Sequence, residues 1–296
     1  MKSKLQKMTM AGGIVASPLF SLLSAATKSR AAAKLALRFD PENFRVMAAG
    51  LGTPAENRLL FSQLLMAAKL VARMNVRSGA ILKECVSYSK SQLLQDAFCL
   101  SASSGKTNGF FVEVGVGNGI DLSNTYLLEK KFGWSGILVE PNTSYHEGIR
   151  SERSAILDVR AATSRSGDFL TFEEMEGEGM HSRLAGTSSA AATGEIKKYQ
   201  VETASLDSIL NKHDAPDVID YVSLDTEGNE MDVLQGLSLD KRQVNVFTIE
   251  HNFEPGKSDR IKRFLGQHGY VSVFEDVSLF DVWLVHESIA ANLEVV

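Results

Sequence analysis

The chain has 296 residues, of which 44% are hydrophobic and 23% charged, and its formal net charge is -5. These values are typical of a soluble globular protein, and the acidic balance argues against a uniformly basic surface for nucleic acid. The length fits one large α/β domain with an extension, or two small domains. Cys85 and Cys99 lack the spacing of a metal site or of a disulfide framework, so we expect buried thiols in a reducing compartment.

The charge is uneven along the chain. Residues 1–38 carry seven basic and no acidic side chains, so the remainder carries -5 minus +7, or -12. The uncharged stretch 8–27 is only marginally long enough to span a bilayer and is weakly apolar. It also resembles a signal peptide, so secretion stays an alternative. We expect a poorly ordered basic tail or a segment that lies on an anionic membrane surface.

A helical extension is predicted over residues 39–90. Apolar side chains recur at three- and four-residue spacing between Leu59 and Val71, and Asn57 is the predicted N-cap. The extension either covers the main domain or pairs with a second copy in a homo-oligomer. Residues 91–288 are then the catalytic domain, which a short helix from Ser91 opens, and residues 289–296 form a tail.

The main domain begins with a strand, a glycine turn and a helix. Residues 110–114 are β-branched or aromatic apart from one acid and predict a buried strand, and residues 123–131 predict a helix. A strand that breaks into glycines before a helix is typical of the first crossover of an open α/β sheet. Glycines let the backbone approach a ligand, because they lack a Cβ. The predicted cofactor residues here are Glu113, Gly115, Gly117, Asn118 and Gly119.

The spacing of these glycines points away from a dinucleotide. The third glycine comes one residue earlier than in the dinucleotide fingerprint G-x-G-x-x-G. An acid at the strand end followed by G-x-G-x-G is the arrangement used for S-adenosylmethionine. A glycine-rich turn without a ligand is the alternative.

The second and third predicted strands add more of the cofactor site. Residues 136–139 end in Glu140 and Pro141, and an acid at this place holds ribose hydroxyls in such folds. Residues 155–159 form the third strand. Backbone groups of Ala161 and Ala162 are predicted to contact the base, with Asp158 as the substitute candidate. Residues 164–194 are expected to be irregular, with a short hairpin through 169–172. His181 and Arg183 in this stretch either contact a substrate or are solvated loop residues.

Acidic residues follow the fourth and fifth predicted strands. Residues 221–224 end in Asp225, with Glu227 next along the chain, and residues 244–249 end in Glu250 and His251. Helices are expected over 206–210, 230–235 and 259–268, and a closing antiparallel pair over 270–274 and 281–285. In a doubly wound sheet, strands one, four and five are neighbours and ligands bind beyond their carboxyl ends. Asp225, Glu250 and His251 are therefore the predicted catalytic residues, over the same crevice as Glu113.

These motifs together resemble the FkbM family of S-adenosylmethionine-dependent methyltransferases, over roughly residues 91–288. The family glycine turn more often reads Gly-Ala-Asn-x-Gly, and Val116 and Gly117 depart from it. The segments that carry the resemblance are Ser91-Gln-Leu-Leu-Gln-Asp96, Phe111-Val-Glu-Val-Gly-Val-Gly-Asn-Gly119, Ser123-Asn-Thr-Tyr-Leu-Leu-Glu129, Gly136-Ile-Leu-Val-Glu-Pro141 and Leu224-Asp-Thr-Glu-Gly-Asn-Glu230.

The resemblance implies a class I methyltransferase fold, a Rossmann-like sheet of order 3-2-1-4-5-7-6, in a cytoplasmic enzyme that uses S-adenosyl-L-methionine. It implies O-methylation of a hydroxyl on a small molecule or glycan, with Asp225, Glu250 or His251 as the base. Magnesium among Asp225, Glu227, Glu250 and His251 stays open. The alternatives are a nicotinamide-dependent oxidoreductase or nucleotide-sugar enzyme, and a binding module without catalysis.

Overall fold

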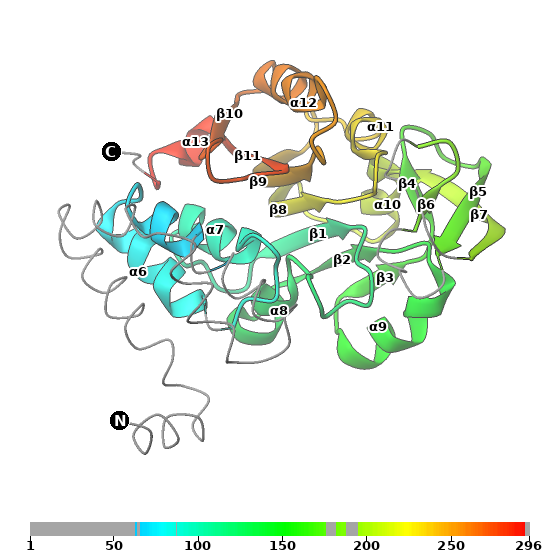
Figure 1. Ribbon diagram of the computed structural model, residues 1–296, viewed down its shortest axis with the longest axis horizontal. Coiled ribbons are helices and arrows are strands. Elements are labelled where there is room, and N and C mark those ends of the chain that lie inside the picture. Colours follow the sequence, from blue (N-terminus) through cyan, green and yellow to red (C-terminus); the bar gives the residue numbers. More distant parts are fainter. Residues whose placement is uncertain (1–62, 64–65, 87, 176–181, 188–194, 294–296) are drawn as a thin grey trace.

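A computed structural model describes residues 63, 66–86, 88–175, 182–187 and 195–293 (Figure 1). The basic segment 1–38, the predicted N-cap Asn57 and His181 lie outside the described residues. In the described part of the extension, helix α6 (Val76–Cys85) begins at Asn75, whose side chain accepts a hydrogen bond from the Ser78 N–H at 2.8 Å. No helix in the described ranges is long and apolar enough to cross a membrane.

The core of the fold is a seven-stranded sheet in the order β10-β11-β9-β8-β1-β2-β3. If these seven strands are renumbered 1 to 7 in chain order, the sheet reads 3-2-1-4-5-7-6 from the β3 edge. Their pairing is parallel except at β11, which runs antiparallel to both β9 and β10. The bounds are β1 Phe110–Val114, β2 Ser135–Val139, β3 Ile156–Asp158, β8 Val218–Leu224, β9 Gln243–Glu250, β10 Tyr270–Val273 and β11 Asp281–His286.

Helices cover both faces of this sheet (Figure 1). One buried apolar cluster joins α6, α7 and α8 to Phe111 and Trp283, and a second joins α10, α11 and α12 to Val112 and Phe247 on the opposite face. Strand residues alternate between the two clusters, because successive side chains of a strand point to opposite faces. The remaining bounds are α7 Gln95–Ala102, α8 Tyr126–Phe132, η1 Thr143–Tyr145, α9 His146–Glu152, α10 Leu206–Lys212, α11 Glu230–Gln235, α12 Lys257–Gly266 and α13 Glu287–Ala290.

The strands of a second, four-stranded sheet lie within and on both sides of residues 164–194, the stretch that the sequence predicts as irregular. Its order is β4-β7-β5-β6, with β4 Ala161–Thr163, β5 Phe169–Met175, β6 Arg183–Leu184 and β7 Ile196–Ser205. The predicted hairpin lies within β5, whose antiparallel partner is β7, 20 or more residues further along the chain. Much of β7 is exposed, so the strand lacks a continuous apolar pattern. The sheet projects from the main domain at the end where β4 lies (Figure 1).

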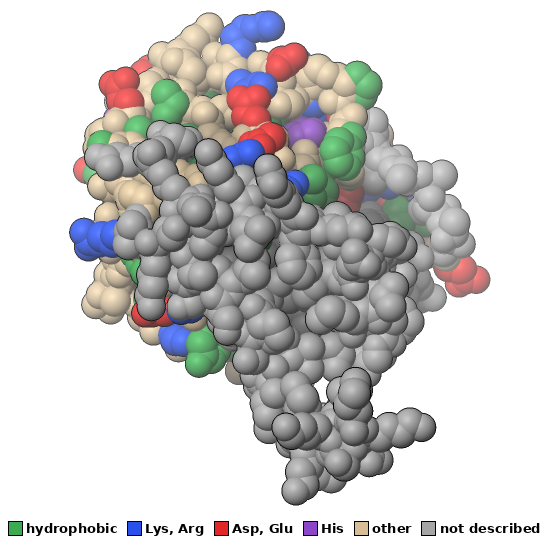
Figure 2. Space-filling model, turned by 60° about the vertical axis from the view of Figure 1, so that its left-hand side comes forward, with side chains coloured by type: hydrophobic (Ala, Val, Ile, Leu, Met, Phe, Trp, Pro, Cys, Tyr) green, Lys and Arg blue, Asp and Glu red, His purple; other side chains and the backbone are tan. Residues whose placement is uncertain are grey.

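The surface carries charges of both signs. On the face drawn in Figure 2, basic and acidic side chains of the described residues are interspersed. Charged side chains of the described residues form ion pairs at several places, as Arg260 does with Glu254 at 2.7 Å and Lys262 with Glu275 at 3.2 Å. Exposed pairs of this kind contribute little to stability.

Candidate active site

One cavity of about 430 Å³ lies at the carboxyl ends of β1, β2, β8 and β9, and the β4 and β6 residues of the second sheet line its other side. This volume is within the usual range for small-molecule sites. The lining residues are Gln92, Glu113, Val114, Gly115, Val116, Gly117, Asp121, Leu122, Asn124, Glu140, Pro141, Ala161, Ala162, Phe172, Ser182, Arg183, Leu184, Asp225, Thr226, Glu227, Asn229, Glu250, Asn252 and Phe280.

The glycine turn closes against the end of β8. Gly115 has φ +81°, and a Cβ there would lie 1.6 Å from the Asp225 carbonyl oxygen. Two backbone hydrogen bonds hold this junction: Gly115 N–H donates to Val139 at 3.0 Å, and Asp225 N–H donates to Val114 at 2.9 Å. Glycine at position 115 is therefore required by the protein backbone itself, whereas Gly117, with φ +56°, faces the cavity.

Glu140 binds the glycine turn from the end of β2. Its Oε2 accepts hydrogen bonds from the N–H groups of Val116 at 2.9 Å and Gly117 at 2.8 Å, and its Oε1 accepts one from Asn142 N–H at 2.8 Å. Burial raises the pKa of this carboxyl to about 7. A carboxylate offers about four lone-pair sites, so three donors leave one site on Oε1 for a ligand hydroxyl.

Glu113 lines the cavity, but other groups of the protein already bind its carboxylate. It accepts hydrogen bonds from Ser123 Oγ at 2.9 Å, Asn124 N–H at 2.6 Å and Thr125 Oγ1 at 2.5 Å, and Arg153 Nη1 lies 3.9 Å away. Burial raises the pKa of Glu113 even though Arg153 opposes this. In this geometry Glu113 holds the chain that leads into α8.

Asn124 is a cavity residue that the motifs of the sequence did not indicate. Its side chain is 7% exposed, and its Nδ2 donates to Ser223 Oγ at 2.9 Å. Its Oδ1 is buried and accepts no hydrogen bond in the described structure. A buried acceptor without a donor costs about 1–3 kcal/mol, so a ligand that donates there gains affinity. The only sequence signal was its place in the run after the glycine turn.

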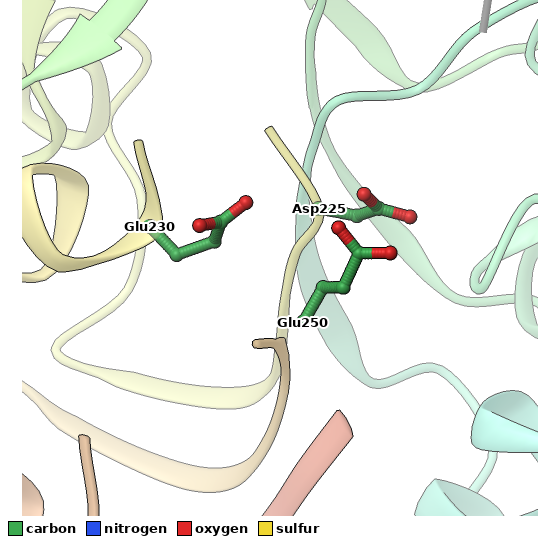
Figure 3. Close-up of side chains that lie close together, drawn as sticks. All are labelled: Asp225, Glu230 and Glu250. Carbon is green, nitrogen blue, oxygen red and sulfur yellow. The ribbon is translucent and has the colours of Figure 1, made fainter. Parts of the chain in front are cut away.

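Two acids meet at the ends of β8 and β9, as predicted from their positions. Figure 3 shows the carboxyl groups of Asp225 and Glu250 side by side. Burial, and then the charge of Glu250, raises the pKa of Asp225 well above its usual range. Burial, and then the charges of Glu227 and Glu230, raises the pKa of Glu250 to about 8. Two such groups titrate as a pair, and each raised pKa favours the protonated carboxyl.

A third acid, Glu230 at the start of α11, approaches the same place (Figure 3), and one carboxylate oxygen from each of Asp225, Glu230 and Glu250 lies within 4.8 Å of the others. The Glu230 side chain is fully buried and pairs with Lys257, whose own side chain is 2% exposed. Its Oε1 accepts hydrogen bonds from the N–H groups of Thr226 at 2.9 Å and Gly228 at 3.1 Å. Glu230 therefore holds the loop that follows Asp225.

Three predicted site residues do not line the cavity. Asn118 Oδ1 accepts from the N–H groups of Ile120 and Asp121, so it shapes the turn. A Cβ on Gly119 would lie 3.1 Å from Ile149 Cγ1, so this glycine allows α9 to pack closely. The His251 ring accepts the Phe253 N–H at 3.1 Å, and burial lowers its pKa. These contacts give Asn118, Gly119 and His251 roles within the protein.

Small residues of β4 line part of the cavity. Ala161 and Ala162 line it as predicted, and the Ala162 carbonyl already accepts a hydrogen bond from Asn229 Nδ2 at 2.9 Å. The substitute candidate Asp158 lies away from the cavity, because it binds Arg160 at 2.6 Å and His213 at 2.8 Å. Burial acts to raise the pKa of the Asp158 carboxyl. The hydrogen bonds from Arg160 and His213 and the charge of Arg160 outweigh burial and hold this pKa well below its usual range.

Comparison with solved structures returns methyltransferases at low similarity. One is a precorrin-6y C5,15-methyltransferase from Geobacter metallireducens GS-15, with 14% identity and a TM-score of 0.36 over 64% of this chain and 84% of that one. Another is a candidate RNA methyltransferase from Pyrococcus horikoshii, with 10% identity and a TM-score of 0.33 over 71% of this chain and 96% of that one. No curated protein sequence matches the chain.

Comparison with family profiles identifies the family of this chain. The profile described as "Methyltransferase FkbM domain" matches residues 113–272, which is more than half of the chain. The match runs from Glu113 at the end of β1 to Ser272 in β10. It therefore includes the glycine turn, Glu140 and the Asp225–Glu250 pair, and the chain belongs to the FkbM methyltransferase family.

Proposed function

We propose that this protein is an S-adenosylmethionine-dependent O-methyltransferase that acts on a hydroxyl of a sugar, glycan, glycolipid or related metabolite. The observation that carries the proposal is the shared cavity, which is lined at once by the glycine turn, by Glu140 and by the Asp225–Glu250 pair. Methyl transfer needs its two reactants held in line, so a common space for cofactor and base is the essential requirement.

The residues present fit this cofactor. Gly117 brings bare backbone to the cavity, and Glu140 keeps one lone-pair site that suits a ribose hydroxyl. The buried Oδ1 of Asn124 suits a donor such as the ammonium of the methionine part. When bound, the cofactor supplies a methyl group on a cationic sulfonium. Ala161 and Ala162 leave room for a flat base against β4.

The Asp225–Glu250 pair supplies the base. When the pair carries one proton, one carboxylate oxygen is free to accept another, and the raised pKa of each acid makes it a stronger base than an ordinary carboxylate. As the acceptor oxygen takes the methyl group, this carboxylate would accept the hydroxyl proton. The doubly protonated pair would then lose one proton to solvent.

The charge around the pair favours an acceptor that donates hydrogen bonds. Asp225, Glu227 and Glu250 line this end of the cavity, and carboxylates only accept hydrogen bonds when ionised. A phosphate or carboxylate acceptor would meet like charges there, which costs free energy. A neutral polyol offers donors and no charge, which supports a sugar-type hydroxyl as the acceptor.

Replacement of the base tests the proposal. Asp225→Asn and Glu250→Gln should each lower turnover by about 10²–10⁴, the usual worth of general-base catalysis. Binding of S-adenosylhomocysteine should change little, because Glu140 and the glycine turn hold that ligand. His251→Ala is the matched control, since His251 ends the same strand outside the cavity, and it should keep most of the activity.

Turnover can be measured with methyl-labelled S-adenosylmethionine and the glycan and lipid fractions of cells that lack the gene, followed by mass spectrometry of the labelled products. Label on a carbon or nitrogen atom would contradict O-methylation. Binding of NAD in place of S-adenosylhomocysteine would favour an oxidoreductase. Tight binding of S-adenosylhomocysteine without transfer to any fraction would favour a binding module.

A further inference from the structure

We propose that the Lys257 ammonium is the built-in cation of the acidic crevice, where it takes the place of a divalent metal ion and positions the loop that carries Asp225. This inference rests on the proposed function, because Asp225 and Glu250 of the crevice are the proposed base. Its tests measure metal binding and thermal stability rather than turnover, so either proposal can fail while the other holds.

The crevice has the composition of a magnesium site. Asp225, Glu230 and Glu250 each bring one carboxylate oxygen to within 4.8 Å of the others. Carboxylate oxygens are the ligands that Mg²⁺ prefers. Acids at this density need a nearby positive charge, because like charges in a buried place repel strongly.

Lys257 provides that charge from inside the protein. Its Nζ contacts Glu230 Oε2 directly and lies 3.8 Å from Glu254 Oε2. The Lys257 side chain is 2% exposed and that of Glu230 is 0% exposed, so both charges have left water. Removal of charges from water costs several kcal/mol for each ion, so the two depend on each other. The ionisable groups that face Lys257 are Glu230, Glu254 and His251.

This pair leaves Glu230 little capacity to bind a metal ion. Its Oε1 already accepts hydrogen bonds from Thr226 and Gly228, and its Oε2 faces the ammonium. Magnesium demands near-ideal octahedral geometry, and only Asp225 and Glu250 of the three acids remain for it. A divalent ion there would also stand close to the Lys257 charge, so the described residues fit an internal ammonium better than a metal.

Lys257 also connects two loops of the cavity. It begins α12, after the β9–α12 loop that includes Asn252, and through Glu230 it holds the β8–α11 loop. In the latter loop Glu227 has φ +56°, a conformation that costs a non-glycine residue free energy. The hydrogen bonds from Thr226 and Gly228 to Glu230 flank Glu227 and hold it in this conformation. Lys257 thus acts on Asp225 through Glu230, as a positioning residue.

Metal titration of the full chain tests the proposal. Isothermal calorimetry with MgCl₂ and MnCl₂ should show no saturable binding to the wild type at up to about 1 mM, the weak limit of dedicated protein sites. Lys257→Met should gain binding of one ion. Lys257→Met combined with Glu230→Gln should lose it again. Lys262→Met, on the same helix but in an exposed ion pair, should behave as the wild type does.

Thermal unfolding covers the case in which Lys257→Met is too unstable to titrate. That variant leaves Glu230 as a buried unpaired carboxylate, so its melting temperature should fall well below that of the double variant, which removes both charges. Equal melting temperatures for the two variants would overturn the proposal. So would one-to-one metal binding by the wild type that Asp225→Asn abolishes, or a folded Lys257→Met variant without a gained metal site.

Discussion

Individual acids in this protein differ in role because their hydrogen-bond partners differ. The Glu113 carboxylate is bound by three donors and Arg153, and it serves the fold. Glu140 is bound by three donors and keeps one site for a ligand. Asp225 and Glu250 lie close together, and burial raises the pKa of both. These contacts support the proposed roles, in which Glu113 builds the site, Glu140 binds the cofactor and the Asp225–Glu250 pair accepts a proton.

Glu140→Gln should weaken binding of S-adenosylhomocysteine by about 1–3 kcal/mol, the cost of a lost charged hydrogen-bond partner. The amide would present N–H donors to Val116, Gly117 or Asn142, which are themselves donors. Calorimetric titration of the purified protein measures the change. Glu147→Gln, exposed on α9, is the control and should bind as the wild type does. Unchanged affinity in Glu140→Gln would remove Glu140 from the cofactor site.

At the scale of elements, the site depends on three strand-to-helix junctions at one edge of the sheet. The junctions after β1, β8 and β9 contain the left-handed residues Gly115, Glu227 and Asn252. Backbone hydrogen bonds from Gly115 to Val139 and from Asp225 to Val114 tie the β1 junction to its two neighbouring strands. The glycine turn therefore contributes to the packing of the sheet as well as to the ligand surface, because it has no space for a side chain at position 115.

Gly115→Ala should destabilise the protein by about 1–3 kcal/mol or more, the range of strained backbone and overpacked sites. Its Cβ would overlap the Asp225 carbonyl oxygen and force β1 and β8 apart. Gly148→Ala is the matched control, since nothing lies within 4 Å of a Cβ there and the residue is in helix α9. It should stabilise by roughly 0.5–1 kcal/mol. Thermal unfolding compares the two, and a stable Gly115→Ala variant would contradict the packing.

Across the whole molecule, buried acids accumulate around the site. Burial raises the pKa of Asp96 to about 6, of Asp281 to about 7 and of Glu250 to about 8. Unfolded carboxyl groups titrate near pH 4. Between these values the folded protein holds protons that the unfolded chain has lost, so the free energy of unfolding falls as the pH rises.

The melting temperature should therefore decrease as the pH rises from about 5 to about 8, and it should level off above this interval, once the folded-state carboxyls have lost their protons too. Asp281→Asn should make this decrease shallower. The amide keeps an oxygen that can accept from Gln95 or Trp283, and it does not titrate. Asp276→Asn, at an exposed acid, should leave the slope unchanged. A melting temperature that is constant or rising over this interval would contradict the raised pKa values.

The sequence by itself determined the family, the glycine turn and the order of the motifs. Strand–turn–helix signals are local, so the main strands of the seven-stranded sheet were readable from short runs of residues. Acids that end parallel strands must meet at one edge of the sheet, so the positions of Asp225 and Glu250 along the chain were enough to place them together. Glu140 could also be identified from the sequence, because it follows the glycine turn at about the distance along the chain that this type of fold predicts.

Only the tertiary structure decided which side chains face the cavity. Asn118 and His251 sit beside cavity residues in sequence, yet each makes its hydrogen bonds to the protein itself. Asn124 faces the cavity because Ser223, on another strand, holds its amide. Lys257 reaches Glu230 from the start of a different helix. These hydrogen-bond and charge partners are neighbours in space rather than along the chain, so periodicity and motif spacing did not identify them.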